Sequence, residues 1–152
     1  MLITYDNTTI NDKLCYKVSM TNCKDAKQVK DNYYNFLSLW KELYAKKISF
    51  CYFFDTSKLT TAPMTYCYSF AKFLKYMKKE DKQYLEFSII IISNSWVRWL
   101  LDLILKLEKP LATLYIVKTV EDANCLLDYK TKNDNILLES YILEKKINVI
   151  DA

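Results

Sequence analysis

The residues with the most chemical potential come directly after two apolar runs and have small polar side chains: Asp55, Thr56, Ser57, Ser93 and Asn94. A single carboxylate among hydroxyls and an amide could bind a small polar ligand, because α/β domains place their ligands at the carboxyl ends of strands. The same residue types also cap helices and form turns. The sequence favours this structural role and keeps a polar cleft as the alternative.

Two residue types are missing from the chain, and with them most catalytic motifs. The 152 residues include no glycine and no histidine, although a usual share of about 7% would give roughly ten glycines. A phosphate-binding loop, a dinucleotide-binding turn and a nucleophile elbow all require glycine. Without histidine, serine and cysteine lack an imidazole base. Codon use in an AT-rich genome accounts for both absences, and we predict a non-enzymatic protein without a cofactor or a metal.

The five cysteines lack the paired spacing of disulfides or metal ligands and are expected to be free thiols. Their number is odd and no two of them form C-x-x-C, whereas a disulfide framework or a thiolate metal site needs paired spacing. Cys15, Cys51, Cys67 and Cys125 lie in apolar periodic stretches, where a thiol behaves as a small hydrophobic side chain. Reduced cysteines, and the lack of a basic and then apolar leader at the N-terminus, predict a cytoplasmic protein.

Apolar periodicity predicts alternating strands and helices along most of the chain. Strands are expected over residues 2–5, 14–20, 48–54, 87–92 and 111–118, and helices over residues 25–46, 64–79, 96–109 and from 119 to the polar break at 130. A polar turn over residues 6–12 would join the first two strands into a hairpin. Buried strands separated by helices require right-handed crossovers and parallel neighbours. The sequence therefore predicts a single-domain α/β fold in the order ββαβαβαβα, with a mixed, mostly parallel sheet and packed helices.

The C-terminal segment is the least defined by its pattern. Residues 1–130 are expected to form the α/β domain, and residues 131–152 a tail packed on it. The stretch over 136–150 fits either a helix or a strand, and the sequence favours a helix over 134–145.

Neither a membrane span nor a nucleic-acid site is expected. The apolar stretch from Phe87 to Leu107 has the length of a span, but Arg98 and Asp102 interrupt it, and each costs about 2.5–3.5 kcal/mol at the centre of a spanning helix. The net charge of +4 comes almost wholly from lysine, which recognises bases and phosphates less well than arginine.

Two stretches resemble the core of the STAS domain, of the anti-sigma-factor-antagonist type, and the related CRAL-TRIO-like lobe. The run from Phe53 to Leu59 is similar to a core strand and its following aspartate, and the run from Lys109 to Ala123 is similar to the late strand–helix unit. With the order of elements, the resemblance covers about residues 1–130. It implies a STAS-like sheet that acts through protein contact, or lipid carriage on the CRAL-TRIO branch.

The same resemblance names one candidate modification site. In the bacterial STAS family a D-S-S-G-L loop at the start of the following helix carries a phosphorylated serine. Counted from Asp55, this loop falls on Pro63 to Cys67, where only Thr65 keeps a hydroxyl and the aspartate, serine and glycine are absent. Thr65 is therefore the candidate regulatory phospho-acceptor, and a threonine in the first turn of a helix is the structural alternative.

The predicted helix over residues 96–109 is apolar around most of its circumference. Its apolar side chains sweep roughly 240°, and a helix on a sheet needs about half of that. An exposed apolar patch marks a partner surface. The candidate interface residues are Val97, Trp99, Leu101 and Leu105. The alternative, held open, is that the C-terminal helix covers them.

These observations predict a non-enzymatic protein-interaction module of STAS-like type, whose partner is another protein or a second copy in a homodimer. A peripheral lipid-binding or membrane-surface protein of CRAL-TRIO-like type is the alternative. It would use the same patch with the lysines of the preceding helix, which are diluted by nearby acids: Lys72, Lys75, Lys78, Lys79 and Lys82.

Overall fold

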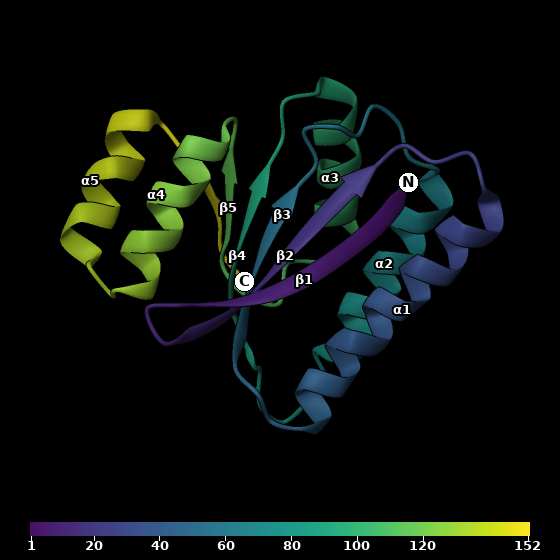
Figure 1. Ribbon diagram of the computed structural model, residues 1–152, viewed down its shortest axis with the longest axis horizontal. Helices are drawn as coiled ribbons and strands as arrows, with labels where there is room; N and C mark the ends of the chain where they lie inside the picture. The colour runs from purple at the N-terminus through teal and green to yellow at the C-terminus, as the bar shows by residue number, and fades with distance from the viewer.

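A six-stranded mixed sheet forms the centre of the computed structural model, which describes residues 1–152 (Figure 1). Its strands lie in chain order: β1 (Leu2–Ile10), β2 (Lys13–Thr21), β3 (Phe50–Asp55), β4 (Leu85–Ile91), β5 (Leu114–Val117) and β6 (Asn148–Ile150). Strands β2 to β5 are parallel, and β1 and β6 pair antiparallel at the two edges. The predicted α/β class and mostly parallel sheet are confirmed.

The helices form one layer on each face of the sheet (Figure 1). One layer contains α1 (Ala26–Ala45), α2 (Met64–Met77) and α3 (Ser95–Leu107), and the other contains α4 (Val120–Thr131) and α5 (Asn135–Lys145). Each of the first three helices joins a strand to the strand beside it. Right-handed crossovers in one direction along a sheet put their helices on the same face, which explains why α1, α2 and α3 lie together.

The β1–β2 hairpin is longer than the sequence predicts. The expected turn over residues 6–12 shrinks to Asn11 and Asp12, because residues 6–10 continue β1 and pair with β2 as far as Ile10 opposite Lys13. The two turn residues have φ of 48° and 66°, the left-handed conformation that matches the twist of a two-residue hairpin. Asn11 donates to the hydroxyl of Thr131 on α4 at 2.9 Å. The polar composition of residues 6–9, which lie at an exposed edge, concealed the strand.

The chain ends its helices without glycine. Lys47, Asn133 and Lys146 take φ of 58°, 56° and 52° just after α1, α4 and α5. After α1, the amide of Ile48 donates to the carbonyl of Leu43, and the amide of Lys47 to that of Tyr44, both at 3.0 Å. This bonding is that of a Schellman motif, in which glycine usually takes the left-handed position. Lysine and asparagine are therefore held in a left-handed conformation that is less favourable for them than for glycine.

The C-terminal segment continues the domain on the face opposite α3. Its predicted helix is present as α5, which packs beside α4 (Figure 1). Beyond α5 the chain adds an unexpected strand, β6, whose Ile150 pairs opposite Leu114 of β5. The expected element order is therefore extended by α5 and β6. Because α5 lies across the sheet from α3, it does not cover that helix.

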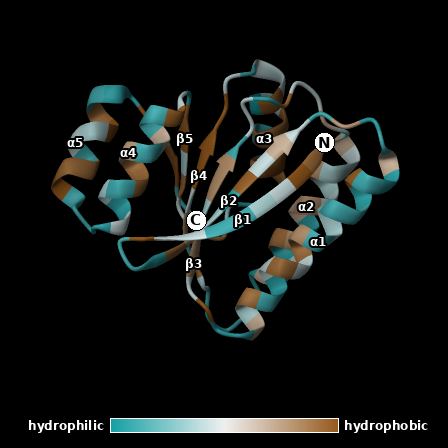
Figure 2. Cartoon of the chain, in the orientation of Figure 1, coloured by the Kyte–Doolittle hydropathy of each residue, from teal (hydrophilic) through white to brown (hydrophobic).

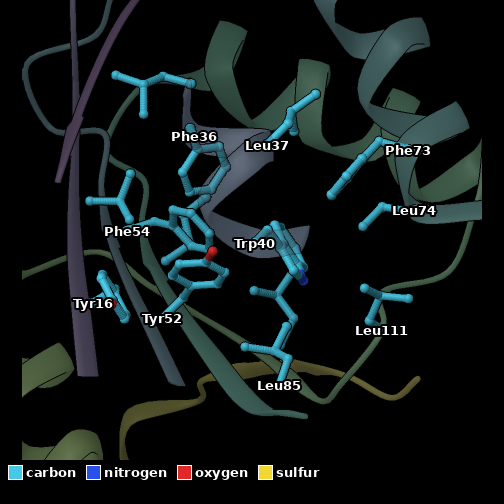
Figure 3. Packing of buried hydrophobic residues seen from close by; sticks show 14 of the residues in the cluster. Tyr16, Phe36, Leu37, Trp40, Tyr52, Phe54, Phe73, Leu74, Leu85 and Leu111 are labelled. Atoms are coloured by element: carbon cyan, nitrogen blue, oxygen red, sulfur yellow. The ribbon is translucent and has the colours of Figure 1, made fainter. Parts of the chain in front are cut away.

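The two faces of the sheet have separate cores. The larger core, under α1 to α3, is rich in aromatic side chains (Figure 3). The smaller core, under α4 and α5, consists mainly of aliphatic and cysteine side chains. Figure 2 shows hydrophobic residues in the central strands β3 to β5, whereas β1 is mostly hydrophilic. All five cysteines are free.

Candidate functional site

The polar residues at the strand ends are held by local hydrogen bonds. Asp55 Oδ1 accepts from the amide of Ser57 at 2.9 Å and from its hydroxyl at 2.6 Å. The hydroxyl of buried Thr56 donates to the carbonyl of Ile91 at 2.5 Å. Asn94 caps α3, since its Oδ1 accepts from two amides of the first turn at 2.8 and 3.3 Å.

Adjacent strands bring these residues to one edge of the sheet, where Asp55 lies beside Ile91 and Ser93 is exposed. Their oxygens point into turns and a helix cap rather than toward a common point. No group of three or more cysteine and carboxylate side chains is arranged to hold a metal ion. The arrangement gives these residues the structural role that their types favour.

Helix α3 packs against the rest of the protein with the side that we expected to be exposed. Val97 is only 6% exposed, and Leu101 and Leu105 are half-buried. The residues that face inward are spaced i, i+3, i+4 and i+7, as on one side of a helix: Val97, Leu100, Leu101 and Ile104. The expectation of an exposed patch is therefore wrong at Val97, while Leu101 and Leu105 are only partly exposed. Of the predicted interface residues, Trp99 is the one that is well exposed.

The exposed apolar flank is centred on two tryptophans. Trp96 and Trp99 are 41% and 45% exposed. Their rings stack with centroids 4.9 Å apart and an interplanar angle of 18°. Half-buried Leu103 and exposed Leu107 continue the stripe one and two turns further on. We call Trp96, Trp99, Leu103 and Leu107 the tryptophan surface. Sequence reasoning placed the apolar excess on the right helix but could not give the rotation of that helix about its axis.

Polar contacts next to the tryptophan surface hold α3 in place against the start of β6. The guanidinium of Arg98 donates to Asp102 at 3.1 Å and to the side chain of Asn148, at the start of β6, at 3.3 Å. A shallow hollow beside the surface is lined by Trp99, Leu103 and Ile150, among others. The C-terminal strand therefore forms the rim of this surface and leaves the two rings uncovered.

A partly open apolar cavity lies behind α3. This cavity, of about 160 Å³, separates the sheet from the layer of α1, α2 and α3 and has 23 hydrophobic residues among its 27 lining residues. Val97, Leu101 and Leu105 line it, so three of the predicted interface residues face the interior. The sequence analysis missed this cavity. Small side chains such as Ala62, Ser88 and Ala112 line it together with large aromatic ones, and no local sequence pattern marks it.

The remaining candidate residues lie on α2 or directly after it. Thr65 is the second residue of this helix and is exposed, and the helix has no side-chain cap at Pro63. The ammonium of Lys78 pairs with the carboxylate of Glu108, which lowers the pKa of that carboxyl. Lys82 lies over the ring of Tyr84, 5.4 Å from its centroid. Lysines 72, 75 and 79 are exposed and take part in no ion pair.

None of the helices combines the length and the apolar character needed to cross a bilayer. No protein-family model, curated protein or solved structure matches the chain.

Proposed function

We propose that the protein is a non-enzymatic interaction module that binds its partner through the tryptophan surface of α3. The observation that carries this proposal is the stacked, exposed pair of Trp96 and Trp99. Each indole leaves apolar area in water, at a cost of about 25 cal/mol per Å². Tryptophan is also the residue type most enriched among the side chains that dominate binding energy at protein interfaces.

The surface is organised before a partner arrives. The two rings hold each other in place by stacking, and Asn94 and Arg98 fix the start and the side of the helix. Side chains that are already ordered lose less conformational entropy on binding. The resemblance of the sequence to STAS domains, which act through protein contact, supports the same function.

The partner is another protein or a second copy of the chain, and cross-linking from the surface separates the two. A photoreactive phenylalanine analogue in place of Trp99 should cross-link to a specific partner in cells that express the protein. The matched control replaces Tyr68, which is similarly exposed on α2 and lies outside the tryptophan surface. Cross-linking to a second copy would identify a homodimer. Identical products from both positions, or none from position 99, would contradict the proposal.

The binding contribution of the surface is measured with two charge-introducing variants. Trp99→Glu should abolish the complex found by cross-linking or, for a homodimer, give a monomer in sedimentation velocity. Tyr68→Glu should leave the complex intact. Both side chains are half in solvent, so circular dichroism should show that both variants fold.

A membrane-surface function is the second candidate, and one observation favours it. Helices α2 and α3 pack side by side, which places the exposed lysines of α2 on the helix next to the two tryptophans. Indoles lie well at the boundary between lipid and water, and lysines attract anionic headgroups. Sedimentation with anionic and with neutral vesicles tests this function. Binding to anionic vesicles that is lost at high salt and in Trp99→Glu would support it, and absence of binding to both would end it.

A further inference from the structure

The cavity under α3 has the volume and the walls of a binding site for a small molecule. Its volume is about 160 Å³, and an engineered apolar cavity of about 150 Å³ in another protein stays dry and binds benzene. Aromatic side chains from α1, α2 and β3 form much of its wall, including Phe36, Trp40, Phe54 and Phe70. A dry space of this size is unfavourable when it is empty, because its lining loses contacts.

The indole of Trp40 offers the cavity a buried hydrogen-bond donor that the protein leaves unused. Trp40 lines the cavity and is 2% exposed, and its indole N–H has no hydrogen-bond partner. In Figure 3 the nitrogen is at the end of the ring nearer Leu85 and Leu111, which also line the cavity. A buried donor without a partner is costly, so an acceptor that enters the cavity would restore a lost hydrogen bond.

The polar groups around Trp40 leave its N–H free. The hydroxyl of Tyr44, one helical turn further on, is close to the indole but donates to Gln83 Oε1 at 2.7 Å and is out of hydrogen-bond geometry with Trp40. Four side chains in the wall carry a hydroxyl. Thr56 donates to a backbone carbonyl and Tyr33 to Ser69. The other two, Tyr66 and Ser88, also line the cavity.

A route into the cavity exists at the C-terminal half of α3. Leu101, Leu105 and Pro110 line the cavity and are only half-buried. The backbones of α2 and α3 also lie closer to each other than to the sheet. Small displacements of these side chains would therefore open the space without breaking a strand or a helix.

We propose that this cavity binds a small aromatic molecule that carries one hydrogen-bond acceptor, such as a carbonyl oxygen. The ring would lie among the aromatic side chains, and the acceptor would take the N–H of Trp40. This site is separate from the tryptophan surface, so the inference does not depend on the function proposed above.

Acetophenone and ethylbenzene are matched probes for this inference, because they differ mainly in the carbonyl. The three tryptophans give three indole N–H signals in an ¹⁵N-correlation spectrum, and Trp40→Phe identifies the signal of Trp40. Both probes should shift the methyl signals of lining residues, and acetophenone alone should move the Trp40 signal downfield. The ratio of the two affinities should change about fivefold in Trp40→Phe, in favour of ethylbenzene. Binding with an unchanged ratio would overturn the choice of acceptor ligands.

A pair of variants on one helix tests the location. Leu101 and Leu103 are both half-buried on α3, and only Leu101 lines the cavity. Leu101→Trp fills the space and should weaken both probes at least tenfold, whereas Leu103→Trp should bind as the wild type does. If neither probe shifts any lining signal of the wild type up to its solubility limit, there is no such site.

Discussion

The two faces of the sheet are packed in different ways, although the same strands supply both. Toward α4 the strands present aliphatic side chains such as Ile89 and Ile91 together with three rings, and they meet aliphatic side chains of the helix, of which Ala123 and Leu126 have no exposed area. The backbone of α4 lies close to β4 and β5. Toward α1, α2 and α3 the strand rings, including Tyr52 and Phe54, meet further rings of α1 and α2, and a cavity remains.

The difference teaches how side-chain shape sets the spacing of layers. Small and branched side chains let a helix approach a sheet closely, whereas a layer of rings that meet edge to face, such as Trp40 on Tyr52 at 4.9 Å, keeps α2 and α3 further from the strands. Rigid rings cannot relax into every gap, and small residues such as Ala112 line the space that remains. We call the face under α4 and α5 the tight face and the face under α1, α2 and α3 the loose face. We infer that a buried residue on the tight face contributes more to the stability of the fold, and that the loose face provides the surfaces for binding.

Truncation of one leucine on each face should give the largest difference in the free energy of unfolding. Leu126→Ala removes a side chain with no exposed area from the tight face and should lower the free energy of unfolding by about 3–4 kcal/mol. Leu101→Ala only enlarges an existing space beside a half-buried side chain and should cost about 1 kcal/mol. Urea unfolding measures both values, and equal losses would show that the two faces are packed alike.

Alkaline pH should weaken the protein through tyrosines on both faces. Burial raises the pKa of Tyr33, Tyr44 and Tyr52 on the loose face and of Tyr115 and Tyr141 on the other. A pKa raised on folding stabilises the folded state below the unfolded pKa, near 10, and that stability is lost as pH rises above it. Urea unfolding between pH 8 and 11 should show constant stability up to about pH 9.5 and a decline beyond it.

One buried hydroxyl distinguishes the loose face further. Tyr52 has no exposed area and its hydroxyl has no partner, whereas the hydroxyl of Tyr33 bonds to Ser69 at 2.9 Å. Tyr52→Phe should therefore raise the free energy of unfolding by about 1 kcal/mol, and Tyr33→Phe should lower it by about 1 kcal/mol. A loss of stability in Tyr52→Phe would mean that its hydroxyl has a bound partner in solution.

The sequence predicted what depends on local periodicity. The order of elements as far as α4 follows from apolar spacing, and Asp25 and Thr119, where the sequence predicts that two helices start, cap α1 and α4. The second half of β1 and all of β6 could not be predicted, because an edge strand with polar residues and a strand of three residues leave no periodic signal. Tertiary pairing determines both strands.

The candidate site was predicted in part for the same reason. An apolar excess on α3 is visible in its sequence, but the choice between the flank of Leu101 and the flank of Trp96 depends on how the helix lies against α2 and the sheet. The cavity depends on the sum of many side-chain volumes across eight helices and strands. No single stretch of sequence contains that information.

The smallest predicted effect concerns the left-handed residue that follows one helix on each face. Lys47 follows α1 on the loose face and Asn133 follows α4 on the tight face, and both are left-handed. Asparagine tolerates this conformation better than lysine, so Lys47→Gly should raise the free energy of unfolding by about 1 kcal/mol and Asn133→Gly by less. Lys46→Gly is the control, because its φ of −82° gives glycine no advantage and the variant should lose stability. If thermal unfolding shows equal gains at positions 47 and 133, the side chain of Lys47 has contacts that offset its backbone cost.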